Sequence, residues 1–498
     1  MKKIKKLILL VFFTASIVSC NDAIEITQPG ILGADQAFSD VEDLRLGLLG
    51  AYNNFDVTQE INFNAVFTDE ISIGVGNGGQ GIADYSYILN PSSSFPTAWW
   101  INNLTALNSI NRVLEAAEGI EPEAGEQQDY NDIVGQLYAL RAFAHFQLAS
   151  YLSTDYSDDS ALSTILLDFV PSVVDDLPRN TNGEIFGLID SDLTLASNLI
   201  ADQSNPVFAS KDFVTALRAR IAAYRGNYAA ANNFASQLLN SYPIANRDQY
   251  SNMFIDEDNT EIIFKLSRQI GDPYDGQGAT GSGFAGGWAG AVFAFVNPTA
   301  SGGAYFEMSR TVFNNLDPAD IRYDVNVHPT SLIDPDYLTN NNDDLDILAI
   351  SKYPGKDGQP LMNDLKIFRS SEMLLIKAEA LADAGSFNGP GNTTAGLLKQ
   401  LRDARFGSDQ PLPNFASEQE AFGAIMDERR IELVYEGHRY KDLKRLGQRA
   451  GRGIDRDPND CDVNNSCTPI PTTSNLFSIP VPLVELNANE VIQQNPGY

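Results

Sequence analysis

Residues 425–447 read IMDERRIELVYEGHRYKDLKRLG, and this stretch is the most informative for the fold class. Spacings of three and four residues place an apolar set on one helical face. Its members are Ile431, Val434, Tyr435 and His438. We therefore predict a helix whose apolar face is buried against neighbouring helices.

The same stretch is also rich in charge. Its charged residues include Glu428, Arg429, Arg430, Glu432 and Arg439. Paired carboxylates perform acid–base catalysis in glycosidases, so a catalytic interpretation is open in principle. Adjacent arginines, however, keep a carboxylate ionised, whereas a general acid needs a raised pKa. We predict a structural charge network that holds this helix to its neighbours.

Segments with helical periodicity recur as pairs along the chain. The first predicted pair includes residues 137–151, and the other three span residues 212–240, 371–404 and 418–447. In the second pair, alanines at helical spacing precede a Gly226-Asn227 turn, and Ala231 stands twelve residues before Pro243. This spacing is typical of tetratricopeptide repeats. The sequence predicts a mostly α-helical fold of about four tetratricopeptide-like hairpins.

Two regions interrupt the helical pattern. Residues 72–96 are rich in glycine and serine, and residues 243–345 combine glycines with aromatics and one short predicted strand at 261–266. Long loops on helical scaffolds are often functional. In chain order we predict a signal peptide at 1–19, first helical pairs at 20–240, a loop and short-strand insertion forming the ligand face at 241–345, and last helical pairs at 346–498.

The N-terminus predicts export. Four lysines precede an apolar run that is too short to span a bilayer, as in secretory signals. Ile17-Val18-Ser19-Cys20 resembles a bacterial lipobox, in which the cysteine is lipidated; an ordinary signal peptide with an incidental cysteine is the alternative. We expect a lipid anchor at Cys20.

The two other cysteines, Cys461 and Cys467, lie six residues apart in a polar loop. In an oxidising compartment this favours a disulfide over two free thiols. The same loop alternates acidic and amide residues: Asp455, Asp457, Asn459, Asp460 and Asp462. Such alternation resembles calcium loops, but the loop lacks the EF-hand glycine and glutamate, so a solvated acidic loop is favoured over bound Ca²⁺. No other cofactor or metal is expected.

Composition narrows the function further. The chain has 498 residues, 43% of them hydrophobic, with a formal charge of −31. Without residues 1–19 the charge becomes −35, because four lysines leave. So acidic a surface repels phosphate backbones, which excludes nucleic acid as a partner.

Several stretches together resemble the SusD/RagB family of outer-membrane nutrient-uptake lipoproteins of Bacteroidota. The stretch at 425–447 resembles that family's E-R-R-x-E-L-x-x-E-G-x-R-x-x-D-L-x-R motif. The further matches are residues 140–143, 371–380, 479–480, 485–487 and 494–498. The resemblance covers essentially the whole chain after the signal.

The resemblance implies a surface-exposed, non-catalytic protein anchored in the outer membrane through lipid on Cys20. It implies binding of an oligosaccharide and its delivery, as a lid, to a SusC-like TonB-dependent transporter. A secreted glycoside hydrolase lacks support, because no hydrolase motif occurs. A helical-repeat scaffold that binds only protein, or a peptide-binding family member, is the alternative.

Sugar recognition combines aromatic planes with amide, carboxylate and guanidinium groups. The three tryptophans lie in or beside the loop regions. The predicted ligand-binding residues are Trp288 and Trp99 first, with Trp100, Tyr305, Tyr85 and Asn77 as further candidates. For Trp100, packing within a helix is the competing interpretation.

Overall fold

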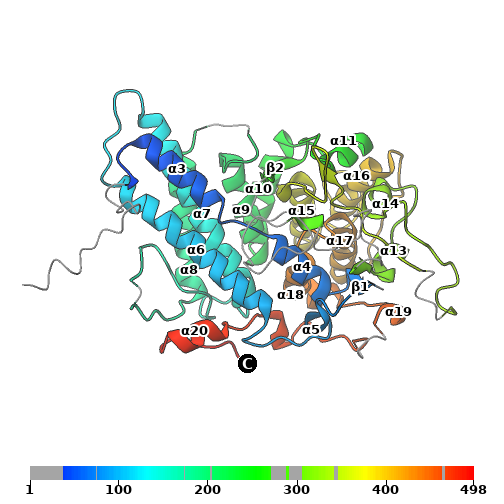
Figure 1. Cartoon of the computed structure of the whole chain (residues 1–498). Coiled ribbons are helices and arrows are strands. Elements are labelled where there is room, and N and C mark those ends of the chain that lie inside the picture. The colour runs from blue at the N-terminus through cyan, green and yellow to red at the C-terminus, as the bar shows by residue number, and fades with distance from the viewer. Residues whose placement is uncertain are drawn as a thin grey trace, which may run out of the picture.

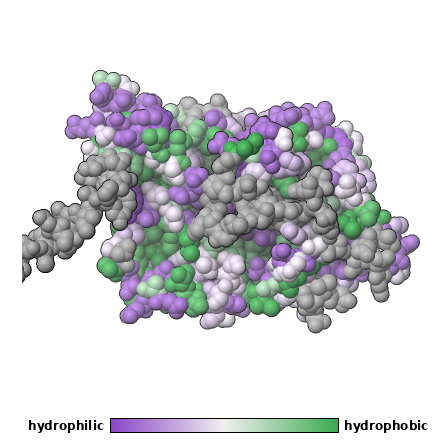
Figure 2. Space-filling view, viewed as in Figure 1, coloured by the Kyte–Doolittle hydropathy of each residue, from purple (hydrophilic) through white to green (hydrophobic). Residues whose placement is uncertain are grey.

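The computed structural model describes residues 37–74, 76–172, 174–201, 205–270, 288–290, 305–340, 346–461 and 466–498. The predicted signal peptide and Cys20 therefore lie outside the described residues. Within them the fold is mostly helical (Figure 1), as predicted. None of the described helices is both long and apolar enough to cross a bilayer. On the face seen in Figure 2, hydrophobic residues form separate areas among hydrophilic ones.

The N-terminal half is built from long helices. Its elements are α3 (Val41–Tyr52), α4 (Thr58–Phe67), β1 (Ile71–Ile73), α5 (Ile82–Tyr85), α6 (Ser94–Ala117), α7 (Gln127–Leu152), α8 (Asn182–Leu199), α9 (Lys211–Tyr224) and α10 (Tyr228–Ser241). Polar side chains start several of these helices. Asp40 accepts from the Asp43 backbone N–H, and Thr181 and Glu184 form a capping box at α8.

The C-terminal half adds two more hairpins and short strands. Its elements are α11 (Arg247–Phe254), β2 (Ile262–Leu266), β3 (Phe306–Met308), α13 (Arg310–Asn314), α14 (Ile321–Asn326), β4 (Gly355–Lys356), β5 (Gln359–Pro360), β6 (Leu365–Arg369), α15 (Ser370–Asp383), α16 (Thr394–Phe406), α17 (Glu418–Glu432), α18 (Arg439–Ala450), α19 (Pro458–Cys461), η3 (Asn475–Phe477) and α20 (Leu483–Ala488). The predicted strand at 261–266 is confirmed as β2. The interval 241–345 contains helices as well as strands.

The described strands pair two by two, all antiparallel. β1 pairs with β3, β2 with β6, and β4 with β5. Two of these pairs join segments far apart in the chain. The β2–β6 pair thus connects the interval 241–345 to the strand that precedes α15, and the β1–β3 pair connects the same interval to the N-terminal half.

The hairpins are α6/α7, α9/α10, α15/α16 and α17/α18, and they match the predicted pairs. One hydrophobic core runs through both halves, from Val41 to Val481. Aromatic rings join the halves: Tyr440 of α18 packs on Phe63 of α4 and stacks on Tyr151 of α7, with ring centroids 5.3 and 5.5 Å apart. The two halves therefore fold around a shared interior.

One local prediction in the C-terminal stretch was wrong. Residues 431–438 do not form one helical face, because α17 ends at Glu432. Tyr435 and Gly437 have φ of 61° and 79°, the left-handed region that breaks a helix. Tertiary contacts stabilise the break, since the Tyr435 hydroxyl donates to the Glu70 carbonyl (3.1 Å) and the Tyr353 hydroxyl donates to the Tyr435 carbonyl (2.7 Å). Val434, Tyr435 and His438 are nevertheless buried, as expected.

Candidate ligand-binding site

The two loop-rich regions meet at the β1–β3 pair. The register aligns Ile71 with Met308 and Ile73 with Phe306. Immediately beyond it, the Gly74 backbone N–H donates to the Tyr305 carbonyl (3.1 Å), and the Asn77 amide donates to the same carbonyl (2.9 Å). Two of the predicted site residues, 228 positions apart, are thus in direct contact.

Asn77 shapes the loop that follows β1. Its amide nitrogen also donates to the Gln80 carbonyl (3.0 Å), and its oxygen accepts from the Gly79 N–H (2.8 Å). Gly81 closes this loop with φ of 68°, and a Cβ there would lie 2.9 Å from the ring of Phe306. Asn77 therefore positions backbone, and the partly buried Tyr305 next to it is the ring at this junction that borders solvent.

Tyr85 is held inside the protein. Its hydroxyl donates to the Asp460 carbonyl (2.7 Å), and the Arg456 guanidinium lies 3.8 Å from its ring centroid. The side chain is fully buried, and burial raises its pKa. Tyr85 ties the loop to α19 and offers no free ring face.

Trp99 and Trp100 lie inside α6, which begins at Ser94, earlier than predicted. Pro96 is tolerated there because it falls in the first helical turn. The Trp99 indole N–H donates to the Gln147 carbonyl (3.1 Å), and the Trp100 indole N–H donates to the Glu485 carboxylate (3.1 Å). Both rings are at least 98% buried, so the structure places them in the core, away from any exposed stacking position.

Trp288 belongs to a small separate cluster with Leu361 and Met362. Its ring is 4% exposed, and among the described contacts its indole N–H has no hydrogen-bond partner. Buried indole N–H groups usually find an acceptor. Of the three tryptophans, Trp288 is thus the one whose indole N–H has no acceptor among the described residues. The glycine-rich segments on either side of it, 271–287 and 291–304, lie outside the described residues.

Two carboxyl groups with opposite pKa shifts lie at the base of β1. Burial would raise the pKa of Asp69, but Arg430 and Arg439 outweigh it and lower the pKa to about 2. Burial, with Asp69 adding to it, raises the pKa of Glu70 to about 8. The Glu70 carbonyl also accepts from the Ser309 N–H (3.1 Å). The site is therefore fixed to the C-terminal stretch through this pair.

Acidic side chains of the loop near residue 460 contact neighbouring parts of the protein. Asp460 accepts from the Arg310 N–H (2.8 Å), and burial raises its pKa to about 8. Asp457 accepts from Tyr337, while Asp455 lies near Arg430. The described residues contain no cluster of three or more His, Cys, Asp or Glu side chains suited to a metal, and Asp462 lies outside them. In the same loop, Cys461 and Cys467 form a disulfide.

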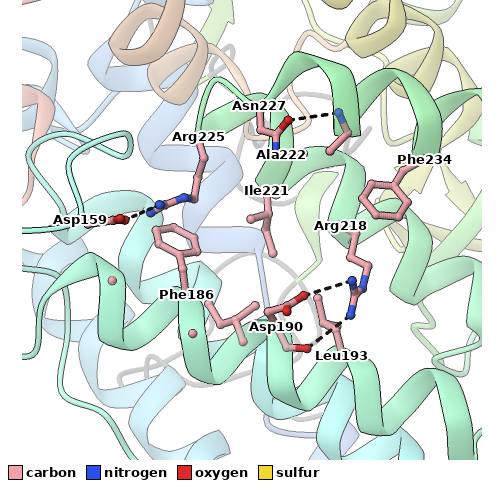
Figure 3. A pocket seen from close by; sticks show the side chains of 14 residues that line it. Asp159, Phe186, Asp190, Leu193, Arg218, Ile221, Ala222, Arg225, Asn227 and Phe234 are labelled. Carbon is pink, nitrogen blue, oxygen red and sulfur yellow. Dashed lines mark hydrogen bonds and ion pairs between the residues drawn. The ribbon is translucent and has the colours of Figure 1, made fainter.

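Sequence reasoning missed a groove of about 390 Å³ between α8, α9 and α10 (Figure 3). Its floor includes two glycines one turn apart on α8, Gly183 and Gly187. Helical glycines are less favourable than alanine by about 1 kcal/mol each. Two of them at i and i+4 were a signal, visible in the sequence, that this helix face is left open.

Two family models match the chain. A family model described as "SusD family" matches residues 354–498, and a second, described as "Starch-binding associating with outer membrane", matches residues 49–223. The first contains the C-terminal stretch and the second contains the loop after β1. The chain belongs to the SusD family.

Individual relatives of this SusD-family chain cover nearly all of it. Two SusD-like proteins of Formosa agariphila are each 25% identical, one over 90% of this chain and 93% of the relative, the other over the whole of both. A SusD superfamily protein from Bacteroides thetaiotaomicron has a TM-score of 0.75 at 21% identity, covering 92% of this chain and 100% of that one. Surface glycan-binding protein A from Bacteroides fluxus has a TM-score of 0.70 at 20% identity, covering 92% and 99%.

The matched regions also divide the candidate site. Asn77 lies inside one matched region, whereas Trp288 and Tyr305 fall between the two. The junction thus combines Asn77 from a matched region with Tyr305 from the segment between the two matched regions.

Proposed function

We propose that this SusD-family chain is a surface-exposed lipoprotein that binds oligosaccharides and delivers them to a SusC-like TonB-dependent transporter. The observation that carries the proposal is the contact of Asn77 with Tyr305, which joins the two loop-rich regions on a SusD-family scaffold. The names of relatives as sugar- or glycan-binding proteins support the ligand class.

The chemistry of the junction suits a sugar. Pyranose rings present C–H faces to aromatic rings and hydroxyls to amides. Tyr305 provides a partly exposed ring, and Trp288 provides an indole donor that is unpaired among the described contacts. The formal charge of −31 favours neutral glycans over sulfated or uronate-rich ones, because like charges repel. We propose binding without chemical turnover.

Binding is tested with the lipid-free protein (residues 21–498). Affinity electrophoresis and calorimetry against starch, β-glucan, xylan and mannan should reveal at least one neutral ligand. We expect Tyr305→Ala, which removes a ring that can stack on a sugar, and Trp288→Ala, which removes an indole donor, to weaken that binding at least tenfold. Thermal melts accompany Trp288→Ala, because that side chain is buried.

The matched control is Phe169→Ala, which removes another partly exposed aromatic from a loop outside the site and should leave binding unchanged. Binding of no glycan, together with capture of a peptide or protein, would instead favour the helical scaffold that binds only protein. Intact chain length of the recovered glycan checks the absence of turnover.

Anchoring and delivery need a separate experiment in cells. We expect Cys20→Ala to release the protein from the outer membrane, and surface protease to reach the wild-type protein. Affinity purification of the anchored protein should bring down a large TonB-dependent barrel. Glycan binding without such a barrel would retain the ligand part of the proposal and overturn the delivery part.

A further inference from the structure

The groove between α8, α9 and α10 lies apart from the loop junction. In Figure 1, α8 lies in the left half of the molecule and α9 and α10 lie nearer its middle, whereas α5 and β1 lie to the right. The groove is formed by described residues alone, and its volume of about 390 Å³ lies within the range of roughly 300–1,000 Å³ typical of small-molecule sites. It is a concavity that the proposed delivery function does not use.

The floor of the groove is open because two side chains are absent. Around Gly187, a Cβ would meet nothing within 4 Å, and around Gly183 it would only touch Asp159 at 3.4 Å. Alanine at either position would suit the helix better. The glycines thus leave room for a flat ring to approach the helix backbone closely.

The walls of the groove combine aromatic side chains with two Arg–Asp ion pairs, whose charges cancel. Figure 3 shows Phe186 and Phe234 at opposite sides, with Ile221 between them. Arg218 pairs with Asp190 (3.1 Å), and Arg225 pairs with Asp159. Each pair uses one carboxylate oxygen and lies at the rim, where both aspartates are more than 70% exposed.

From these features we propose that the groove is a second carbohydrate site, which takes one or two pyranose units of a neutral glycan. The partly exposed Phe234 ring and the glycine floor contact the C–H faces of the sugar, and the buried Phe186, which packs under the Arg225 guanidinium, supports the opposite wall. The paired aspartates and arginines accept from and donate to the sugar hydroxyls. A lining of zero net charge, in a protein of charge −31, fits a neutral ligand better than an anionic one. The inference rests on the groove and does not require the loop junction to bind.

The occupant is assigned as a sugar rather than an extended peptide on two grounds. A peptide needs backbone hydrogen-bonding partners along a strand or helix-length groove. This groove is short, and the polar side chains that line it are the two ion pairs at its rim and Asn227. Those groups suit a cluster of hydroxyls, which both donate and accept.

The test uses the lipid-free protein and three neutral probes: maltoheptaose, laminarihexaose and mannohexaose. Gly187→Phe fills the groove from the floor, and calorimetry should show at least a tenfold loss of affinity, or loss of one site from the stoichiometry, for at least one probe. Arg218→Met, which keeps the length of the side chain but removes its donors, should weaken the same probe at least threefold. The matched control is Gly50→Phe, on an exposed helical position of α3 with nothing within 4 Å of the added Cβ.

Outcomes separate this site from the loop junction. Two independent sites are supported if Gly187→Phe loses affinity for a probe while Gly50→Phe keeps it, and if the losses from Gly187→Phe and Tyr305→Ala add up in the double variant. Unchanged affinity and stoichiometry in Gly187→Phe for all three probes overturns the inference while leaving the junction's role intact. The inference is also overturned if none of the probes binds at 10 mM, or if Gly187→Phe weakens the binding of a peptide pool but of no glycan.

Discussion

The hairpins α9/α10 and α17/α18 share a topology but are stabilised by different contacts. α9 and α10 meet through small side chains, and the fully buried alanines include Ala216, Ala219, Ala231 and Ala235. Gly226, with φ of 72°, and Asn227, which caps α10, form the tight turn between them. Small residues let these helix axes approach closely, and the buried charge of α9, Arg220, pairs outside the hairpin with Glu372 of α15.

α17 and α18 instead hold a buried network of ions. Glu432 accepts from Arg405 (2.8 Å) and Arg369 (2.5 Å), and Arg429 of α17 donates to Asp442 of α18 (2.7 Å). Each buried charge depends on its partners, because an unpaired charge is costly in the interior. The comparison teaches that the alanine hairpin is sensitive to volume, whereas the ionic hairpin is sensitive to loss of a single charge.

The largest expected effect comes from Glu432→Ala. The substitution leaves Arg369 and Arg405 buried with incomplete partners, so we expect a loss of about 3–5 kcal/mol in the free energy of unfolding. Burial opposes ionisation of Glu432, but Arg405 and Arg369 hold its pKa well below the usual range. Urea denaturation at pH 7 measures the loss. A change below about 1 kcal/mol would contradict a network whose members depend on one another.

The alanine hairpin is broken by added volume. Ala231→Leu inserts three carbons at a position with no exposed surface, and we expect a loss of about 1–3 kcal/mol from overpacking. Ala229→Leu, on the exposed side of the same helix, is the matched control and should change stability by less than about 0.5 kcal/mol. Equal melting temperatures for the two variants would show that the α9/α10 interface is packed loosely enough to accommodate the larger side chain.

Glu70 sharpens the comparison, because it is a buried carboxyl beside the ionic network whose second oxygen lacks a partner among the described contacts. Its pKa is raised from 4.5 to about 8, chiefly by burial. The folded state therefore keeps a proton that the unfolded state releases, and stability falls as pH rises from about 4.5 to 8.

For Glu70→Gln we expect this part of the pH dependence to disappear. One such group contributes a slope of up to about 1.4 kcal/mol per pH unit. Unfolding free energies at half-unit steps between pH 4.5 and 8.5 should converge at the acid end and favour the variant at pH 8. Parallel curves for the two proteins would mean that Glu70 is ionised in the folded state.

The helical hairpins were predictable because their periodicity, turns and small residues are local signals. The break after Glu432 was not, since Tyr435 is turned out of the helix by contacts with Glu70 and Tyr353, which lie far away in sequence. A hydrophobic pattern records that these residues are buried but not in which backbone conformation.

The candidate site was predictable only in part for the same reason. Glycine-rich segments indicated the two loop regions. The β1–β3 pairing that brings Asn77 to Tyr305 is a long-range contact, which local sequence patterns do not indicate. Tryptophan identity alone did not separate Trp99, whose indole donates to a core carbonyl, from Trp288, whose indole has no described acceptor. The groove on α8 went unnoticed because its signal is the absence of side chains.

The smallest expected effect lies on the same helix as the largest. Asp427 of α17 makes a bidentate pair with Arg452 (2.8 and 2.6 Å), but both side chains are more than 40% exposed. Water screens such a pair, and we expect Asp427→Asn to cost less than about 1 kcal/mol, falling towards zero in 0.5 M salt. Urea denaturation at low and high salt, with Glu432→Ala alongside, measures both. Both carboxylates are in direct contact with arginine, so a large loss at Asp427 would contradict the view that burial, rather than the ion pair itself, makes the α17/α18 hairpin sensitive to a single charge.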